Sequence, residues 1–165
     1  MSPLKIIIAD DHAAVRKSLC LLMECELDIE VVAETTNGVD TIRAVQNLQP
    51  DLLLLDIKMP QLNGLEVLQY LRNEKHSIGI IVLSNHCEQL YVAAALRLGA
   101  DAFITKSAGV DALMEAIQVI RKRVIAARAE ALLRSAEVEA PRGGGLLAET
   151  RAELDQTRRA WSEAG

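Results

Sequence analysis

Five short hydrophobic runs, each followed by a stretch with helical periodicity, constrain the fold of this 165-residue chain more than any other feature. The runs cover residues 4–9, 29–33, 52–55, 78–83 and 102–105. In the segments that follow them, apolar residues recur at three- and four-residue spacing, as Val15, Leu19 and Leu22 do. Strand and helix are therefore predicted to alternate five times along the chain.

This alternation predicts the fold class. The run at 52–55 contains only leucine, which is typical of a central parallel strand covered by helices on both faces. Pro50 and Gly99 end two of the predicted helices, and the last helix begins near Asp111 and meets no strong breaker before Pro141. We therefore expect an α/β protein with a five-stranded, doubly wound, flavodoxin-like (βα)5 parallel sheet and an extended C-terminal helix.

Composition and charge exclude several kinds of protein. Half of the residues are hydrophobic, enough to bury a core, and the net charge of −5 argues against broad attraction to nucleic acid or anionic membranes. No apolar segment is long enough to span a bilayer, and the first apolar run stops at two aspartates, unlike a signal peptide. Cys20, Cys25 and Cys87 lack metal-binding spacing and are interpreted as buried or bystander thiols. We expect a protein of the reducing cytoplasm.

Polar residues stand where four of the predicted strands end. Asp10 and Asp11 follow the first run, Asp56 the third, Ser84 the fourth and Lys106 the fifth. Because the carboxyl ends of parallel strands meet at one edge of a sheet, we expect these side chains to form a single site. Three carboxylates, a hydroxyl and an amine suit a divalent cation and a phosphoryl group.

Each of these residues also has a simpler structural explanation when it is taken alone. Asp10 or Asp11 could cap the helix that follows it. Ser84 could bond to local backbone in a turn. His12 and His76 are predicted to be ordinary surface residues. It is the occurrence of the whole set at strand ends that favours a site.

Four segments, read in order, resemble the hallmark segments of response regulator receiver domains of two-component signalling. They are KIIIADDH, DLLLLDIKMPQLNG, IIVLS and GADAFITK. The resemblance covers roughly residues 4–124 and implies a receiver domain at 1–124, followed by a helical extension and tail at 125–165. The segment GADAFITKSAGVDALMEAI is similar to the subfamily of transcription regulators that usually carries a LuxR-type helix-turn-helix output domain.

The resemblance implies a phosphoacceptor that depends on Mg²⁺. Asp56 would be the carboxylate nucleophile that takes the phosphoryl group. Asp10 and Asp11 would hold Mg²⁺ together with Asp56 and the backbone carbonyl of Lys58. Lys106 would pair with phosphoryl oxygens. The product would be a phosphoprotein carrying an aspartyl phosphate.

Further residues are implied by the same resemblance. The Ser84 hydroxyl would donate a hydrogen bond to a phosphoryl oxygen. Phe103 aligns with the aromatic switch position of the family, although it could equally be an ordinary core residue. Asn85 and His86 would flank the site, where Asn85 could narrow the access to the acceptor and His86 could tune the phosphoryl lifetime or simply be solvated.

The resemblance implies a signalling switch that catalyses its own phosphorylation and dephosphorylation, with a sensor histidine kinase or a phosphotransfer protein as its partner. An alternative is a phosphorylation-independent interaction or dimerisation module with the same fold. A phosphohydrolase similar to the haloacid dehalogenases is disfavoured, because Lys58 stands where those enzymes place an acid/base aspartate.

The sequence departs from the family pattern at three places, one of which is Asn85, because a smaller residue commonly follows the hydroxyl residue. Ser107, and not the frequent proline, follows Lys106, so we expect a trans peptide bond there. No output domain is legible after residue 124, so contact with DNA is expected only through a domain that this sequence does not contain. Leu147, Leu154 and Trp161 recur every seven residues and could mark a homodimer seam, although a sustained coiled coil needs more positions.

Overall fold

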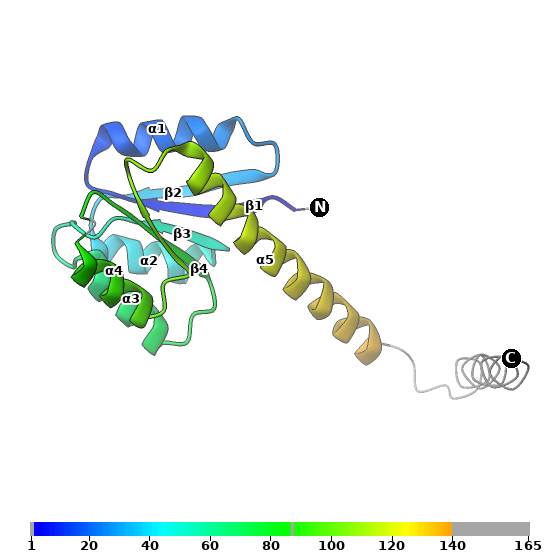
Figure 1. The fold of residues 1–165 in the computed structure, drawn as a ribbon. Coiled ribbons are helices and arrows are strands. Elements are labelled where there is room, and N and C mark those ends of the chain that lie inside the picture. Colours follow the sequence, from blue (N-terminus) through cyan, green and yellow to red (C-terminus); the bar gives the residue numbers. More distant parts are fainter. Residues whose placement is uncertain (1, 87, 140–165) are drawn as a thin grey trace, which may run out of the picture. The chain divides into compact units, whose positions relative to one another are not determined.

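The computed structural model describes residues 2–86 and 88–139 and confirms the predicted alternation of strands and helices (Figure 1). The elements are β1 (Leu4–Ala9), α1 (Ala13–Glu24), β2 (Ile29–Thr35), α2 (Gly38–Leu48), β3 (Leu52–Leu55), α3 (Gly64–Asn73), β4 (Gly79–Ser84), α4 (Gln89–Arg97), β5 (Ala102–Thr105) and α5 (Val110–Glu139). Cys87, Pro141 and the heptad positions Leu147, Leu154 and Trp161 lie outside the described residues.

The five strands form one parallel sheet in the order β2-β1-β3-β4-β5. This is the predicted doubly wound, flavodoxin-like topology, in which the chain reverses its direction of travel across the sheet after β2. The reversal places the carboxyl ends of β1 and β3 side by side, with Ala9 in register with Leu55. The residues that follow these two strands therefore meet at the switch point of the sheet.

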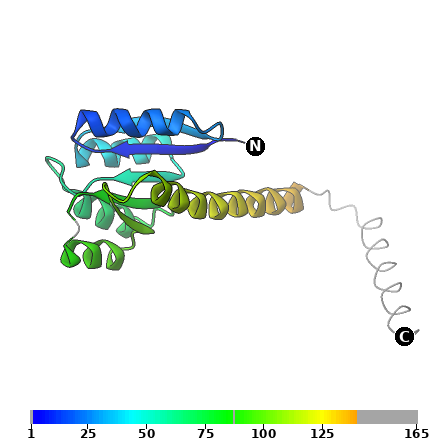
Figure 2. The same cartoon turned by 45° about the horizontal axis from the view of Figure 1, so that its top comes forward.

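Helices cover both faces of the sheet, with α1 on one face and α3 and α4 on the other (Figures 1 and 2). Leu19 and Met23 of α1 share a buried cluster with Leu113 and Ile117 of α5. The opposite cluster contains buried residues from α2, α3 and α4. All four residues of β3 are buried, as the all-leucine run predicts for a central strand.

Two strands have boundaries that differ from the prediction. β2 runs two residues further, to Thr35, because Thr35 continues the parallel pairing of this strand with Ala9 of β1. β4 begins and ends one residue later than predicted, so Ser84 is the last residue of the strand and pairs in register with Thr105 of β5. The predicted site residue Ser84 is consequently fixed by the sheet itself.

The loop between β3 and α3 is held close to the end of β3. Asn63 and Glu66 form a reciprocal capping box that starts α3. The backbone N–H of Gly64 donates to the carbonyl of Ile57 at 2.8 Å. A methyl group at Gly64 would overlap the carbonyl oxygen of Asp56, so only glycine allows the helix to begin this near to the strand.

The chain divides into two units, residues 1–126 and 127–165, and α5 extends from the first into the second. Of the second unit, the structure describes 127–139, where Leu132 and Leu133 are exposed and Arg134 pairs with Glu130 at 3.3 Å. The predicted division after residue 124 stays a prediction. Within the described residues, no helix is long and apolar enough to cross a membrane.

Candidate functional site

Two buried carboxylates stand at the switch point of the sheet. Asp10 follows β1 and Asp56 follows β3, and their exposed fractions are only 2% and 4%. The backbone N–H of Asp56 donates to the carbonyl of Ala9 at 2.9 Å, which extends the pairing of the two strands up to the acidic residues. Asp11 comes next in the chain and is exposed. The predicted convergence of these three carboxylates is observed.

Lys106 reaches both buried carboxylates from the end of β5. Its Nζ lies 2.6 Å from Oδ2 of Asp10 and 3.1 Å from Oδ2 of Asp56. Burial alone would lower the pKa of the Lys106 ammonium, but hydrogen bonds to Asp10 and Asp56 outweigh this effect and hold that pKa above its usual value. Lys106 is therefore charged at neutral pH and offsets part of the buried negative charge.

The second oxygens of the two carboxylates are held by local backbone. Oδ1 of Asp10 accepts the N–H of His12 at 2.8 Å, and Oδ1 of Asp56 accepts the N–H of Ile57 at 2.8 Å. One ammonium stands against three carboxylates, Asp10, Asp11 and Asp56, so the group keeps an excess of negative charge. Oxygen donors with an uncompensated negative charge are the donor set that a hard divalent cation such as Mg²⁺ requires, so these residues fit the metal that the sequence implies.

His12 belongs to this acidic group, although the sequence predicted only a surface residue. Its side chain is exposed, as expected, but its Nδ1 lies 2.8 Å from Oδ1 of Asp11 and 3.3 Å from Oδ1 of Asp10. Ligand atoms of Asp10, Asp11, His12 and Asp56 all lie within 4.8 Å of one another. The signal that could have found His12 is its position directly after the Asp-Asp pair, at the start of α1.

Ser84 is fully buried beside the strand that carries Lys106. Its carbonyl accepts the backbone N–H of Lys106 at 3.1 Å, and its Oγ accepts the backbone N–H of His86 at 3.2 Å. Ser84 thereby fixes where Lys106 leaves the sheet. The structure does not bring its hydroxyl into a hydrogen bond with the carboxylates.

Phe103 lies away from the acidic group. It is half-buried and packs against the core cluster on the side of α4, as do Tyr91 and Leu98. In the sheet it pairs in register with Val82, two residues before Ser84. This placement suits both an ordinary core residue and an aromatic residue that senses movement at the end of β4.

The remaining predicted residues lie near the ends of β3 and β4. Lys58 and Asn85 are exposed. His86 is half-buried and turns toward α4, where its ring meets that of Tyr91 edge-on at a centroid distance of 5.9 Å, and its Nδ1 lies 3.8 Å from Oε1 of Glu88. None of the peptide bonds in the described part of the chain is cis, so the Lys106–Ser107 bond is trans, as predicted.

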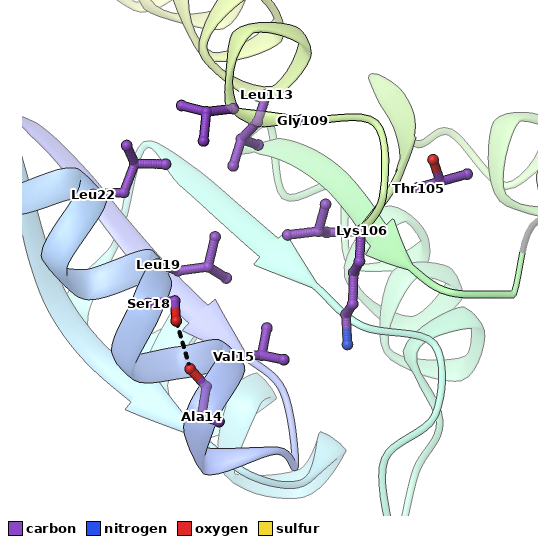
Figure 3. A pocket seen from close by; sticks show the side chains of 11 residues that line it. Ala14, Val15, Ser18, Leu19, Leu22, Thr105, Lys106, Gly109 and Leu113 are labelled. Carbon is purple, nitrogen blue, oxygen red and sulfur yellow. Dashed lines mark hydrogen bonds between the residues drawn. The ribbon is translucent and has the colours of Figure 1, made fainter.

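A pocket of about 570 Å³ lies behind Lys106, between α1, the β5–α5 loop and the start of α5 (Figure 3). Its walls are mostly apolar and include Val15, Leu19 and Leu113. The aliphatic stem of Lys106 forms part of this lining, while its ammonium points to the carboxylates. The pocket was not predicted, because it depends on how α1 and α5 meet over the sheet.

Comparisons with known proteins place the chain in one family. The profile described as response regulator receiver domain matches residues 6–118. The chain is 40% identical over 117 residues to the nitrate/nitrite response regulator protein NarL of Escherichia coli, covering 70% of this chain and 53% of NarL. It is 36% identical over 116 residues to the transcriptional regulatory protein YhcZ of Bacillus subtilis, covering 70% and 54% of the two chains.

A solved structure supports the same family assignment as these relatives. The crystal structure of a DNA-binding response regulator of the LuxR family from Staphylococcus aureus superposes with a TM-score of 0.68 at 30% identity, covering 71% of this chain and 98% of that one. The chain spans about half the length of the curated relatives it matches. The chain resembles regulators of the NarL and LuxR type. With the sheet topology, the acidic group and the profile match in agreement, the chain belongs to the response regulator receiver domain family.

Proposed function

We propose that the chain is a phosphoacceptor switch in which Asp56 takes a phosphoryl group from the phosphohistidine of a sensor histidine kinase or a phosphotransfer protein. The observation that carries this proposal is the buried Asp56 carboxylate, whose Oδ2 lies 3.1 Å from the Lys106 ammonium and within reach of the Asp10 and Asp11 carboxylates. As the bond from an Asp56 oxygen to phosphorus forms, the phosphorus–nitrogen bond of the donor would break, and the imidazole would keep the electron pair.

The acidic group would hold Mg²⁺ through Asp10, Asp11, Asp56 and the backbone carbonyl of Lys58. When bound, this ion would offset the repulsion between the anionic acceptor and the anionic phosphoryl group. The Lys106 ammonium, now shared between two carboxylates, would exchange its bond to Asp56 Oδ2 for one to a phosphoryl oxygen. The Lys106 ammonium would then neutralise part of the negative charge that the phosphoryl group adds to the site.

Ser84 would supply a second contact to the phosphoryl group. Its Oγ accepts the His86 N–H, and this leaves the hydroxyl proton to be donated. Phosphorylation would draw the end of β4 toward the new charge and let the Phe103 ring move inward behind it. Phe103 lacks a hydroxyl, so packing alone would favour its inward state.

The surface that responds would lie on α4 and β5 with the adjoining part of α5. On α4, Leu90 and Leu96 are exposed to 78% and 49%, so apolar positions are already available to a partner on this face. We propose that this surface serves a protein partner or a second copy of the chain. Transcription regulation would follow through an output domain, and DNA would be contacted by that domain and not by the receiver.

Intact-mass spectrometry after incubation with acetyl phosphate and Mg²⁺ tests the proposal. We expect a single phosphoryl adduct on the wild type, no adduct on Asp56→Asn, and loss of the adduct when EDTA replaces the metal. A wild-type protein that stays unmodified, even with a phosphorylated histidine donor, would contradict the proposal and favour the phosphorylation-independent interaction module.

A further inference from the structure

Arg16 is a charged residue on the buried face of α1. It precedes Leu19 by three positions and Met23 by seven, the spacing at which residues of a helix share one face, and both of these side chains are buried against the sheet. The Arg16 side chain is itself only 17% exposed. Because arginine is rarely buried unless its guanidinium is paired, the groups that it binds explain its position.

The guanidinium of Arg16 binds the backbone of the acidic group. Its Nη1 donates a hydrogen bond to the carbonyl oxygen of Asp10 at 2.9 Å. This carbonyl belongs to the peptide group that joins Asp10 to Asp11, and a peptide group is planar, so a donor on its oxygen fixes the orientation of the whole group. Arg16 therefore holds the backbone from which the Asp11 side chain projects.

A second partner, Glu34 of β2, is less well aligned with Arg16. Glu34 pairs in register with Ile8 of β1, and its Oε2 lies 3.3 Å from Nε of Arg16. That buried Nε nevertheless makes no hydrogen bond with any residue that the structure describes. A buried donor without an acceptor is costly, whereas an ion pair to a carboxylate that is 48% exposed contributes little. The orientation of the guanidinium is therefore set by the Asp10 carbonyl and not by Glu34.

Asp11 depends on this support more than Asp10 does. The Asp10 side chain is 3% exposed, and its two oxygens are held by the backbone N–H of His12 and by the Lys106 ammonium. The Asp11 side chain is 37% exposed, and its carboxylate contacts the ring of His12, which is 66% exposed. The direction of the Asp11 carboxylate is thus determined mainly by the backbone that carries it.

We propose that Arg16 is a positioning residue for the divalent-cation site, which fixes the peptide group between Asp10 and Asp11, and with it the Asp11 carboxylate, and thereby raises the affinity of the site for Mg²⁺. Residues that orient metal ligands without touching the metal commonly change metal affinity by about 10- to 100-fold. The inference rests on the Mg²⁺ site of the proposed function but not on phosphoryl transfer, so it is tested on the unphosphorylated full chain.

Calorimetric titration with Mg²⁺ compares the wild type with Arg16→Gln, Glu34→Gln and the control Arg43→Gln, which alters a 71%-exposed arginine of α2. We expect Arg16→Gln to weaken Mg²⁺ binding about tenfold. Glu34→Gln removes the ion pair but leaves the bond to the Asp10 carbonyl, so it should change the affinity by less than about twofold, as should the control.

Nitrogen-15 NMR of the metal-free protein gives a readout that does not need the metal. A hydrogen bond to a carbonyl polarises the peptide group to which that carbonyl belongs. Loss of the Arg16 bond should therefore shift the amide resonance of Asp11 in Arg16→Gln, and this resonance should stay in place in Glu34→Gln. Arg16→Lys, which keeps the charge, is the second variant should Arg16→Gln not fold, and in it the Asp11 resonance and the Mg²⁺ affinity should either both change or both stay.

Three results would overturn the proposal. They are a wild-type Mg²⁺ affinity in Arg16→Gln, an equal loss of affinity in Arg16→Gln and Glu34→Gln, and an Asp11 shift in either Arg16 variant without a loss of affinity. A purely structural role of Arg16 would lower stability and leave the Mg²⁺ affinity of the folded protein unchanged. A protein that shows the expected affinities but never accepts phosphate would refute the phosphoacceptor function and leave this inference standing.

Discussion

Replacing Lys106 by methionine should destabilise the protein by about 3–5 kcal/mol when no divalent cation is present, the usual cost of removing one partner from a buried ion pair. The Lys106 side chain is 11% exposed, and those of Asp10 and Asp56 are 3% and 4% exposed. Methionine keeps most of the apolar stem that lines the neighbouring pocket. The loss should therefore come from two buried carboxylates that are left without a cation.

Urea denaturation with and without Mg²⁺ measures this effect. Mg²⁺ should stabilise Lys106→Met by more than it stabilises the wild type, because the metal would replace the missing positive charge. The pKa of Lys106 is raised in the folded state, so its contribution is complete below about pH 10.4, the usual value for lysine, and is lost as the pH rises through the folded-state pKa. The difference between the two proteins should stay constant from about pH 7 to about pH 10 and shrink only above that range.

Lys17→Met is a matched control, because Lys17 is exposed on α1 and its replacement should change stability by no more than about 0.5 kcal/mol. Two results would contradict this prediction. One is a loss below about 1 kcal/mol in Lys106→Met, the level of a surface ion pair. The other is an equal response of variant and wild type to Mg²⁺.

Three further predictions concern the stability of the protein. Gly64→Ala should cost at least about 2 kcal/mol in urea denaturation, because its methyl would meet the Asp56 carbonyl, whereas Gly109→Ala, which has open space at a φ of +91°, should cost only about 1 kcal/mol of backbone strain. Asp101→Ala should cost about 1.5–3 kcal/mol by the same assay, because the Asp101 carboxylate accepts the backbone N–H of Ile80 in β4 and forms an ion pair with Arg72 of α3. Mg²⁺ at about 100 times its dissociation constant should stabilise the wild type by about 2.7 kcal/mol in thermal unfolding, and Asp11→Asn should remove most of this gain.

The sequence predicted the convergence of Asp10, Asp56 and Lys106 because parallel strands leave no freedom in where their carboxyl ends meet. Once the five apolar runs are recognised as strands, the residues that follow them must share one edge of the sheet. The all-leucine strand β3 and the long helix α5 were also predictable, because the local pattern of apolar residues indicates both the burial of a strand and the length of a helix.

The sequence could not predict which atoms meet within the site. Whether Lys106 contacts one carboxylate or two depends on the width of the sheet and on the rotamer of a four-carbon side chain, neither of which has a sequence signature. His12 is exposed, as predicted, but its contact with Asp11 has no sequence signature, because a histidine beside a helix start has several possible orientations. The ends of β2 and β4 were missed by one or two residues because pairing with neighbouring strands, and not local apolarity, carries Thr35 and Ser84 into the sheet.

The proposed function requires that Asp56, among all the carboxylates of the chain, is the acceptor. Borohydride reduction after treatment with acetyl phosphate and Mg²⁺ converts an aspartyl phosphate to homoserine, which peptide mass spectrometry can locate. We expect homoserine at position 56 alone, and only when Mg²⁺ was present. Homoserine at position 10 or 11, or its absence from a protein that carries a phosphoryl adduct, would contradict it.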